Sequence, residues 1–318
     1  MKQRNLLFSI VLLLALYLSA INSAYSQGLT PDDVVSIQTV GAVAMSPNGQ
    51  HVAYTLSVPR TEQEMRGRNF SELYLLPASG GDPISVIGKP NSAGSPQWGT
   101  DGRLYFTARL SDQHAQTQVY SVNASGSDLR RHTAAEYGVS SYSWNRDGST
   151  IAYTSMDPIS AERRAEIERG FDMIVAGENL RYMRLWVQPA NGEAVQISPE
   201  EAYVWDFSWD PNGSRLAIRI SDRPGADEDQ LFTRIAVIGA DGSGMEEWMA
   251  APKKKAAMSW SPDGTRLAVL AGKVFSDPLP QRLWIIDTET GAMRDYTPEE
   301  WEGTIESMSW MDDRTVAF

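Results

Sequence analysis

The feature that most constrains this sequence is a repeated unit: an aromatic residue, a short turn that ends in glycine, and an apolar segment. The unit occurs five times in the same order. Four copies begin with tryptophan and the first begins with methionine; they occupy residues 45–49, 98–102, 144–148, 209–213 and 260–264. A sixth copy begins at Trp310 and is cut off by the end of the sequence. The chain is therefore predicted to be a repeat protein.

The spacing and chemistry of the copies indicate the fold class. Their turn glycines are separated by 53, 46, 65 and 51 residues, and periods near 40–50 residues with many turns are typical of propeller blades. Each copy also contains a second glycine turn and several short β-branched or aromatic runs, which are strand signals. We expect an all-β β-propeller of four-stranded blades, with five complete blades and part of a sixth.

The tryptophans of the repeat could be read as stacking residues for a ligand. Each nevertheless stands at the same position of its copy, where side chains of successive blades pack between adjacent sheets and bury large areas. We therefore interpret Trp98, Trp144, Trp209, Trp260 and Trp310 as structural residues.

The N-terminus has the pattern of a secretory signal peptide. Lys2 and Arg4 precede an apolar run over residues 6–18, and small residues stand at 24 and 26, before Gln27. Thirteen apolar residues are few for a membrane span. We expect residues 1–26 to be a signal peptide and residues 27–318 to form the propeller domain; an uncleaved N-terminal anchor is the alternative.

The cysteine content and the net charge indicate which compartment and which classes of partner suit this chain. The chain has no cysteine, so it holds neither a disulfide nor a lipid-anchoring cysteine. Removal of Lys2 and Arg4, with no acid in residues 1–26, changes the net charge from −12 to −14. Such an acidic chain disfavours nucleic acid and anionic membranes as partners. We predict a periplasmic or secreted bacterial protein with no membrane contact after signal cleavage.

The last repeat predicts that the chain continues beyond residue 318. The 292 residues left after signal removal suffice for five to six blades of about 50 residues. A stop within the sixth copy would leave an apolar strand unpaired. We expect a longer parent protein; a five-bladed ring closed by half a blade is the alternative.

One insertion departs from the repeat. It spans residues 156–182, between the second and third strands of the third copy, and its segment 160–169 is rich in helix formers and stopped by Gly170. A solvated helix covering a sheet edge is one interpretation. In the other, Glu162, Glu166 or Glu168 faces the amino group of a substrate or a partner domain, because long loops on repeat scaffolds often carry function.

The chain itself lacks recognisable catalytic chemistry. No G-x-S-x-G occurs, and the three histidines, expected at the surface, form no H-x-x-x-H pattern. The acidic segment 227–229, expected to be a loop, lacks the register of a calcium loop. We expect no cofactor, no metal and no catalytic residue within the chain.

The turn-and-strand unit W-S-P-D-G-x-x-[LI]-A resembles the propeller repeat of TolB-like periplasmic proteins and of prolyl oligopeptidase-family serine peptidases. Two segments tilt the resemblance towards the acylaminoacyl-peptidase and dipeptidyl-peptidase branches of that family. They are the opening 29–54 and the stretch 154–187 with its charged helix. The resemblance covers residues 29–318.

The resemblance implies a propeller set over a C-terminal α/β-hydrolase domain that carries a Ser-Asp-His triad. The propeller would restrict access, so that short peptides are cleaved and folded proteins are excluded. In the dipeptidyl-peptidase branch, acids on a propeller-borne helix hold the free N-terminus of the substrate. The resemblance therefore implies Glu162 and Glu166 as the candidate substrate-binding residues of this chain.

Two other functions stay open. The chain could be a TolB-like, non-enzymatic propeller that docks protein partners in the cell envelope, or a propeller fused to another hydrolase such as an amidohydrolase. A G-x-S-x-G motif, an early stop or a histidine-aspartate metal cluster beyond residue 318 would distinguish the three.

Overall fold

The computed structural model describes residues 28–110, 116–175, 177–249, 257–273 and 280–318. The signal-peptide prediction therefore lies outside the described residues. Of the described residues, 28–39 and 57–69 belong to a small compact unit, and the others belong to a second, larger unit. The small unit contains helix α2 (Pro31–Ser36), whose N-cap Thr30 and Asp33 form a reciprocal capping box.

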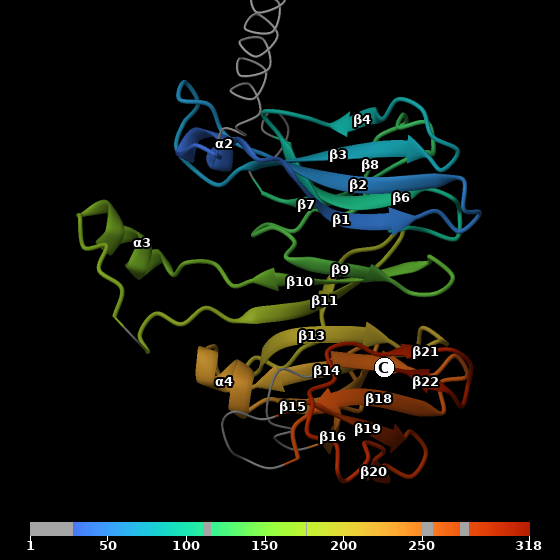
Figure 1. The fold of residues 1–318 in the computed structure, drawn as a ribbon. Helices are drawn as coiled ribbons and strands as arrows, with labels where there is room; N and C mark the ends of the chain where they lie inside the picture. The colour runs from blue at the N-terminus through green and yellow to red at the C-terminus, as the bar shows by residue number, and fades with distance from the viewer. Residues whose placement is uncertain (1–27, 111–115, 176, 250–256, 274–279) are drawn as a thin grey trace, which may run out of the picture. The chain divides into compact units, whose positions relative to one another are not determined.

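Five four-stranded antiparallel sheets follow one another along the chain (Figure 1). The first sheet contains β1 (Thr39–Met45), β2 (His51–Val58), β3 (Phe70–Pro77) and β4 (Ile84–Ile87). The second contains β5 (Ser92–Trp98), β6 (Leu104–Arg109), β7 (Gln118–Val122) and β8 (Arg130–Arg131). The third contains β9 (Ser141–Trp144), β10 (Thr150–Met156), β11 (Met183–Pro189) and β12 (Val195–Gln196).

The fourth sheet contains β13 (Tyr203–Trp209), β14 (Arg215–Ser221), β15 (Arg234–Gly239) and β16 (Glu246–Met249). The fifth contains β17 (Ala257–Trp260), β18 (Arg266–Ala271), β19 (Arg282–Asp287) and β20 (Met293–Asp295). A two-stranded sheet of β21 (Ser309–Trp310) and β22 (Val316–Ala317) comes last. The prediction of a β-propeller with five complete blades and part of a sixth is confirmed.

Apolar side chains fill the junction between each pair of successive sheets. The middle strands supply them: β14 and β18 are almost wholly buried, and Leu216 and Leu267 have no exposed surface. The outer strands are short, and β8, β16 and β20 carry charge, as the two exposed arginines of β8 illustrate. A sheet that lies between two others packs on both of its faces, so its inner strands are apolar on both faces, as β14 and β18 are.

The repeat tryptophans link one sheet to the next. The indole Nε1 of Trp209 donates to the backbone oxygen of Ser143, 3.1 Å away, and Trp260 donates to Ser208 in the same way. Trp98 and Trp310 make equivalent bonds to Ala44 and Ser259. The acceptor is each time the residue just before the first residue of the preceding copy, which is Met45 in the first copy and tryptophan in the others. The structural role expected for these tryptophans is confirmed, with one exception at Trp144.

A second set of repeated hydrogen bonds, which was not predicted from the sequence, joins the third strand of a blade to the residues after its fourth strand. The backbone nitrogen of Leu185 donates to Ser198 Oγ, and the backbone nitrogen of Leu283 donates to Thr297 Oγ1. The preceding arginine donates to the carbonyls that follow the outer strand, as Arg282 does to Thr297 and Pro298. Buried carbonyls at the blade edge are thereby paired.

Candidate functional site

Two helical insertions extend from the same side of the sheets. Helix α3 (Ala161–Glu168) lies between β10 and β11, and helix α4 (Ala226–Leu231) lies between β14 and β15. Figure 1 shows both on the side opposite the hairpin turns that join the first and second strands. Loops in equivalent positions share a side because all blades have the same strand order.

Helix α3 has defined ends. Ser160 is its N-cap and accepts a hydrogen bond from the backbone nitrogen of Arg163, whereas Gly170 ends it with a φ of +90°. None of its residues is buried. The predicted helix is confirmed, and its exposure means that it is held in place by contacts other than core packing.

Arg163 provides the main contact within the insertion. Its guanidinium donates to Glu166 Oε2 at 3.0 Å and to the backbone oxygens of Phe171 and Met173 at 2.9 and 2.7 Å. Only 14% of its side-chain surface is exposed. One arginine therefore ties the helix to the loop that follows it.

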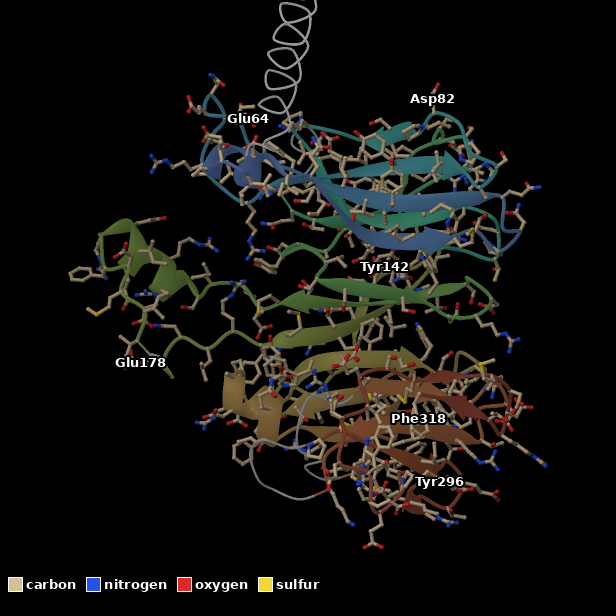
Figure 2. All side chains as sticks on the ribbon, in the orientation of Figure 1. Glu64, Asp82, Tyr142, Glu178, Tyr296 and Phe318 are labelled. Atoms are coloured by element: carbon tan, nitrogen blue, oxygen red, sulfur yellow. The ribbon has the colours of Figure 1, made fainter. Side chains whose placement is uncertain are left out.

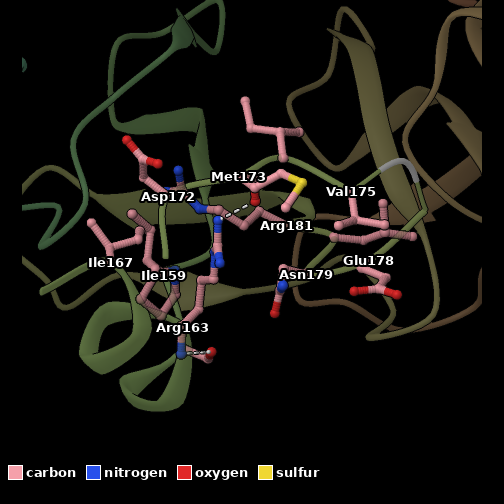
Figure 3. Close-up of a pocket in the computed structure, with 13 residues that line it drawn as sticks. Ile159, Arg163, Ile167, Asp172, Met173, Val175, Glu178, Asn179 and Arg181 are labelled. Atoms are coloured by element: carbon pink, nitrogen blue, oxygen red, sulfur yellow. Dashed lines mark hydrogen bonds between the residues drawn. The ribbon is translucent and has the colours of Figure 1, made fainter. Parts of the chain in front are cut away.

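The insertion encloses a pocket of about 500 Å³ (Figure 3). Its wall is largely apolar, and four charged side chains interrupt it. In Figure 3 Arg163 crosses the middle of the pocket, with Ile159 and Ile167 on one side and Asn179 on the other. Apolar pockets with a few polar groups are the usual form of a small-ligand site.

The two predicted substrate-binding residues do not line this pocket. Glu166 is paired with Arg163, so part of its charge is already neutralised, and Glu162 is exposed on the helix surface. The charged lining residues are instead Arg163, Asp172, Glu178 and Arg181. Asp172 and Glu178 were not among the predicted site residues, because they follow the helix in a segment without periodicity.

The base of the insertion is clamped. The Arg184 guanidinium holds the Asp157 carboxylate through Nε and Nη2, with the shortest separation 2.7 Å. The Asp157 backbone nitrogen donates to the Tyr182 carbonyl, and the Tyr182 backbone nitrogen donates to Asp157 Oδ2. Arg181 Nε donates to the Asp157 carbonyl at 2.6 Å. Both ends of the insertion thus meet at Asp157, and such charge-assisted bonds are stronger than neutral ones.

Helix α4 corrects the expectation of an acidic loop at 227–229. The segment is helical, and two of its three acids are paired: Glu228 with Arg223 at 2.6 Å, and Asp229 with the buried Arg219. Neighbouring Tyr203 stacks near Trp205 with ring centroids 4.4 Å apart. Burial, and then the charge of Asp229, raise the pKa of Tyr203. Pairing with arginine therefore engages two of the acids of this short helix.

The histidine expectation also needs correction. His51 and His132 are half-buried between strands, and the His132 ring lies 2.8 Å from Ser121 Oγ. Burial, followed by the charge of Arg103, lowers the pKa of His132. His114 lies outside the described residues. Within the described ranges, no three metal-ligating side chains are grouped closely enough to hold an ion.

No family model matches the chain. Among curated proteins, it is 22% identical to dipeptidyl-peptidase 5 of Porphyromonas endodontalis over 171 residues, which are 53% of this chain and 24% of that protein. It is 24% identical to the uncharacterized peptidase YuxL of Bacillus subtilis over 204 residues, 59% of this chain and 30% of that one. The chain thus spans less than a third of the length of these relatives.

Solved structures agree on the fold. An acylaminoacyl peptidase in complex with Z-Gly-Gly-Phe-chloromethyl ketone superposes with a TM-score of 0.62 at 14% identity, covering 86% of this chain and 42% of that one. The β-propeller domain of the Trilobed protease from Pyrococcus furiosus gives a TM-score of 0.56 at 13% identity, covering 88% and 77%. The resemblance to the propeller region of prolyl oligopeptidase-family peptidases is confirmed.

The propeller fold is what the described residues share with these solved structures. Its middle strands form the scaffold, and its second-to-third-strand loops carry the insertions. In the part of the chain that the structure describes, no helix has the length and apolar character needed to cross a bilayer.

Proposed function

We propose that this chain is the access-controlling propeller of an exported serine peptidase that hydrolyses short peptides. The relationship to named peptidases carries the proposal. An α/β-hydrolase domain would follow in the full-length protein and supply the catalytic triad. The apolar run at 6–18 and the small residues before Gln27 support export.

The insertion supports the substrate class. A pocket of about 500 Å³ with apolar walls fits one or two side chains of a short peptide. The exposed Glu162 and the lining acids Asp172 and Glu178 would favour a protonated amino terminus. Because Glu166 already pairs with Arg163, Glu162 is the stronger of the two original candidates.

The kinetic test uses the full-length protein and two substrates, a short peptide with a free amino terminus and its N-acetylated form. Glu162→Gln should raise KM for the free-amine peptide about threefold to tenfold, the range of one partly solvated charge-assisted bond. The KM for the acetylated peptide should not change. Glu193→Gln is the matched control, since Glu193 is an exposed glutamate in the turn between β11 and β12, outside the insertion.

If the KM for the free-amine peptide is the same in Glu162→Gln as in the wild type, the proposed role of Glu162 is contradicted. A full-length protein that cleaves no peptide would contradict the enzymatic proposal as a whole. The TolB-like binding propeller would then be the better description. Intact mass of the secreted protein, with Gln27 as its first residue, tests export separately.

A further inference from the structure

The junction between the second and third sheets breaks the tryptophan pattern of the repeat. Trp144 Nε1 is buried and has no hydrogen-bond partner. By analogy with the other copies, its acceptor would be the carbonyl of Gln97, the residue before Trp98. A buried N–H without a partner is costly and needs an explanation.

The cause is one large residue at a position that is otherwise small. Within each blade the repeat tryptophan pairs with an apolar residue of the second strand, such as Ile151, Leu216 or Leu267. The next residue faces the following tryptophan, and in these three sheets it is a fully buried alanine: Ala152, Ala217 and Ala268. In the second sheet, where Trp98 pairs with Leu104, the next residue is Tyr105.

Tyr105 acts as a wedge. Its ring centroid lies 5.2 Å from that of Trp144. A Cβ placed on Gly99 would lie only 2.6 Å from Tyr105 Cε2, so this turn requires glycine where the other copies have Ser46, Asn145, Asp210 and Ser261. Burial and the hydrogen bond to Asp101 raise the pKa of Tyr105 to about 12, so its hydroxyl stays protonated and donates to Asp101 Oδ2 at 2.9 Å.

The preceding strand is distorted at the same junction. Strand β5 contains a register shift between Gly94 and Gln97, and Ser95 has a φ of +50°, in the left-handed region that serine rarely adopts. Tyr142 of the third sheet donates to the Ser95 carbonyl, and Gln97 donates back to the carbonyl of Tyr142. Figure 2 shows Tyr142 in the body of the sheets and Glu178 out in the insertion.

A cavity of about 280 Å³ lies beside the wedge, between the turns 98–101 and 145–148. Three aromatic side chains line it: Trp98, Tyr105 and Trp144. Asp101 and Asp147 contribute carboxylates, and the exposed Arg146 contributes donors. These turns lie on the side opposite α3 (Figure 1), so the cavity is separate from the pocket in the insertion.

We infer that this cavity between the second and third sheets is a binding site for a single sugar ring. The ligand must donate to carboxylates, accept from Arg146 and pack against aromatic faces. Hydroxyl groups both donate and accept, whereas an ammonium or guanidinium group accepts nothing and would face Arg146. The volume is below the roughly 300–1,000 Å³ of drug-sized pockets, which fits one ring.

The test follows the tryptophan indole N–H signals of the full-length protein by NMR, with the Trp144 signal assigned from Trp144→Phe. The probes are the methyl glycosides of glucose, galactose, mannose and N-acetylglucosamine. Titration with at least one should shift the Trp144 signal saturably. Asp147→Asn and Tyr105→Ala should weaken that binding at least tenfold.

Asp263→Asn is the matched control, because Asp263 holds the same turn position three residues after its tryptophan and should leave binding unchanged. Tyr105→Phe keeps the wedge and loses only the hydroxyl, so it separates a binding effect from collapse of the cavity and should retain a measurable shift. No saturable shift with any of the four glycosides would overturn the inference. Saturation by arginine amide in their place would overturn the ligand class.

Discussion

The buried middle strands and the insertion at 157–182 are stabilised by different interactions. The strands β14 and β18 bury nearly all of their residues, on both faces, and equivalent contacts recur from sheet to sheet. The insertion buries no helical residue and is held by charge-assisted bonds from Arg163 and Arg184. The scaffold therefore sets the stability, and the insertion can vary in sequence at little cost to the fold.

The largest expected effect tests that division directly. Leu216→Ala removes a fully buried side chain between the third and fourth sheets and should lower the free energy of unfolding by about 2–5 kcal/mol. Ile174→Ala, in the insertion, alters a side chain that is 93% exposed and should change it by less than about 0.5 kcal/mol. Urea denaturation measures the free energy of unfolding of both variants. Similar decreases would contradict the view that the strands, and not the insertion, set the stability.

The next effect concerns the clamp. Asp157→Asn removes the charge that Arg184 holds and should favour local opening of the insertion by about 1–2 kcal/mol. Amide hydrogen exchange should accelerate across 158–181 and stay slow in β10 and β14. Asp172→Asn, a lining residue of the same insertion, is the control and should leave exchange unchanged. Faster exchange throughout the sheets would mean that the clamp belongs to the scaffold.

A smaller effect separates regular from irregular sheet junctions. Trp260→Phe keeps an aromatic ring and loses the bond to the Ser208 carbonyl, which should cost about 1 kcal/mol beyond the change in packing. Trp144→Phe has no such bond to lose, so its cost should be smaller by that amount. Thermal denaturation of both variants measures the difference. An equal cost would show that the Trp144 indole is paired in solution.

The smallest effect is at a turn of the scaffold. Bonds from the Ser261 hydroxyl and then from the Thr265 backbone lower the pKa of Asp263 from 3.8 to about 2. The resulting stabilisation is complete above the ordinary pKa and is lost as the pH falls through about 2. Between about pH 4 and 2, the free energy of unfolding should fall less steeply in Asp263→Asn than in the wild type, as measured by denaturation at a series of pH values. Parallel curves would contradict it.

The sequence predicted the scaffold well, because period, turn chemistry and apolar runs all report the same local geometry. It located α3 because helix formers, Ser160 and Gly170 are local signals as well. It did not locate the pocket, since Asp172 and Glu178 come together with Ile159 only after Arg163 folds the loop back. In the sequence, Tyr105 stands at a repeat position that is alanine in the third, fourth and fifth copies. Its effect on Trp144 could not be predicted, because that effect depends on how two sheets pack.

The most direct test of the central claim is the hydrolysis of peptides by the full-length protein, measured on short unstructured peptides and on a folded protein that contains the same sequences. A propeller that controls access to a peptidase predicts cleavage of the peptides and none of the folded protein. Cleavage of neither, in a protein whose circular dichroism shows a folded β structure, would contradict the claim.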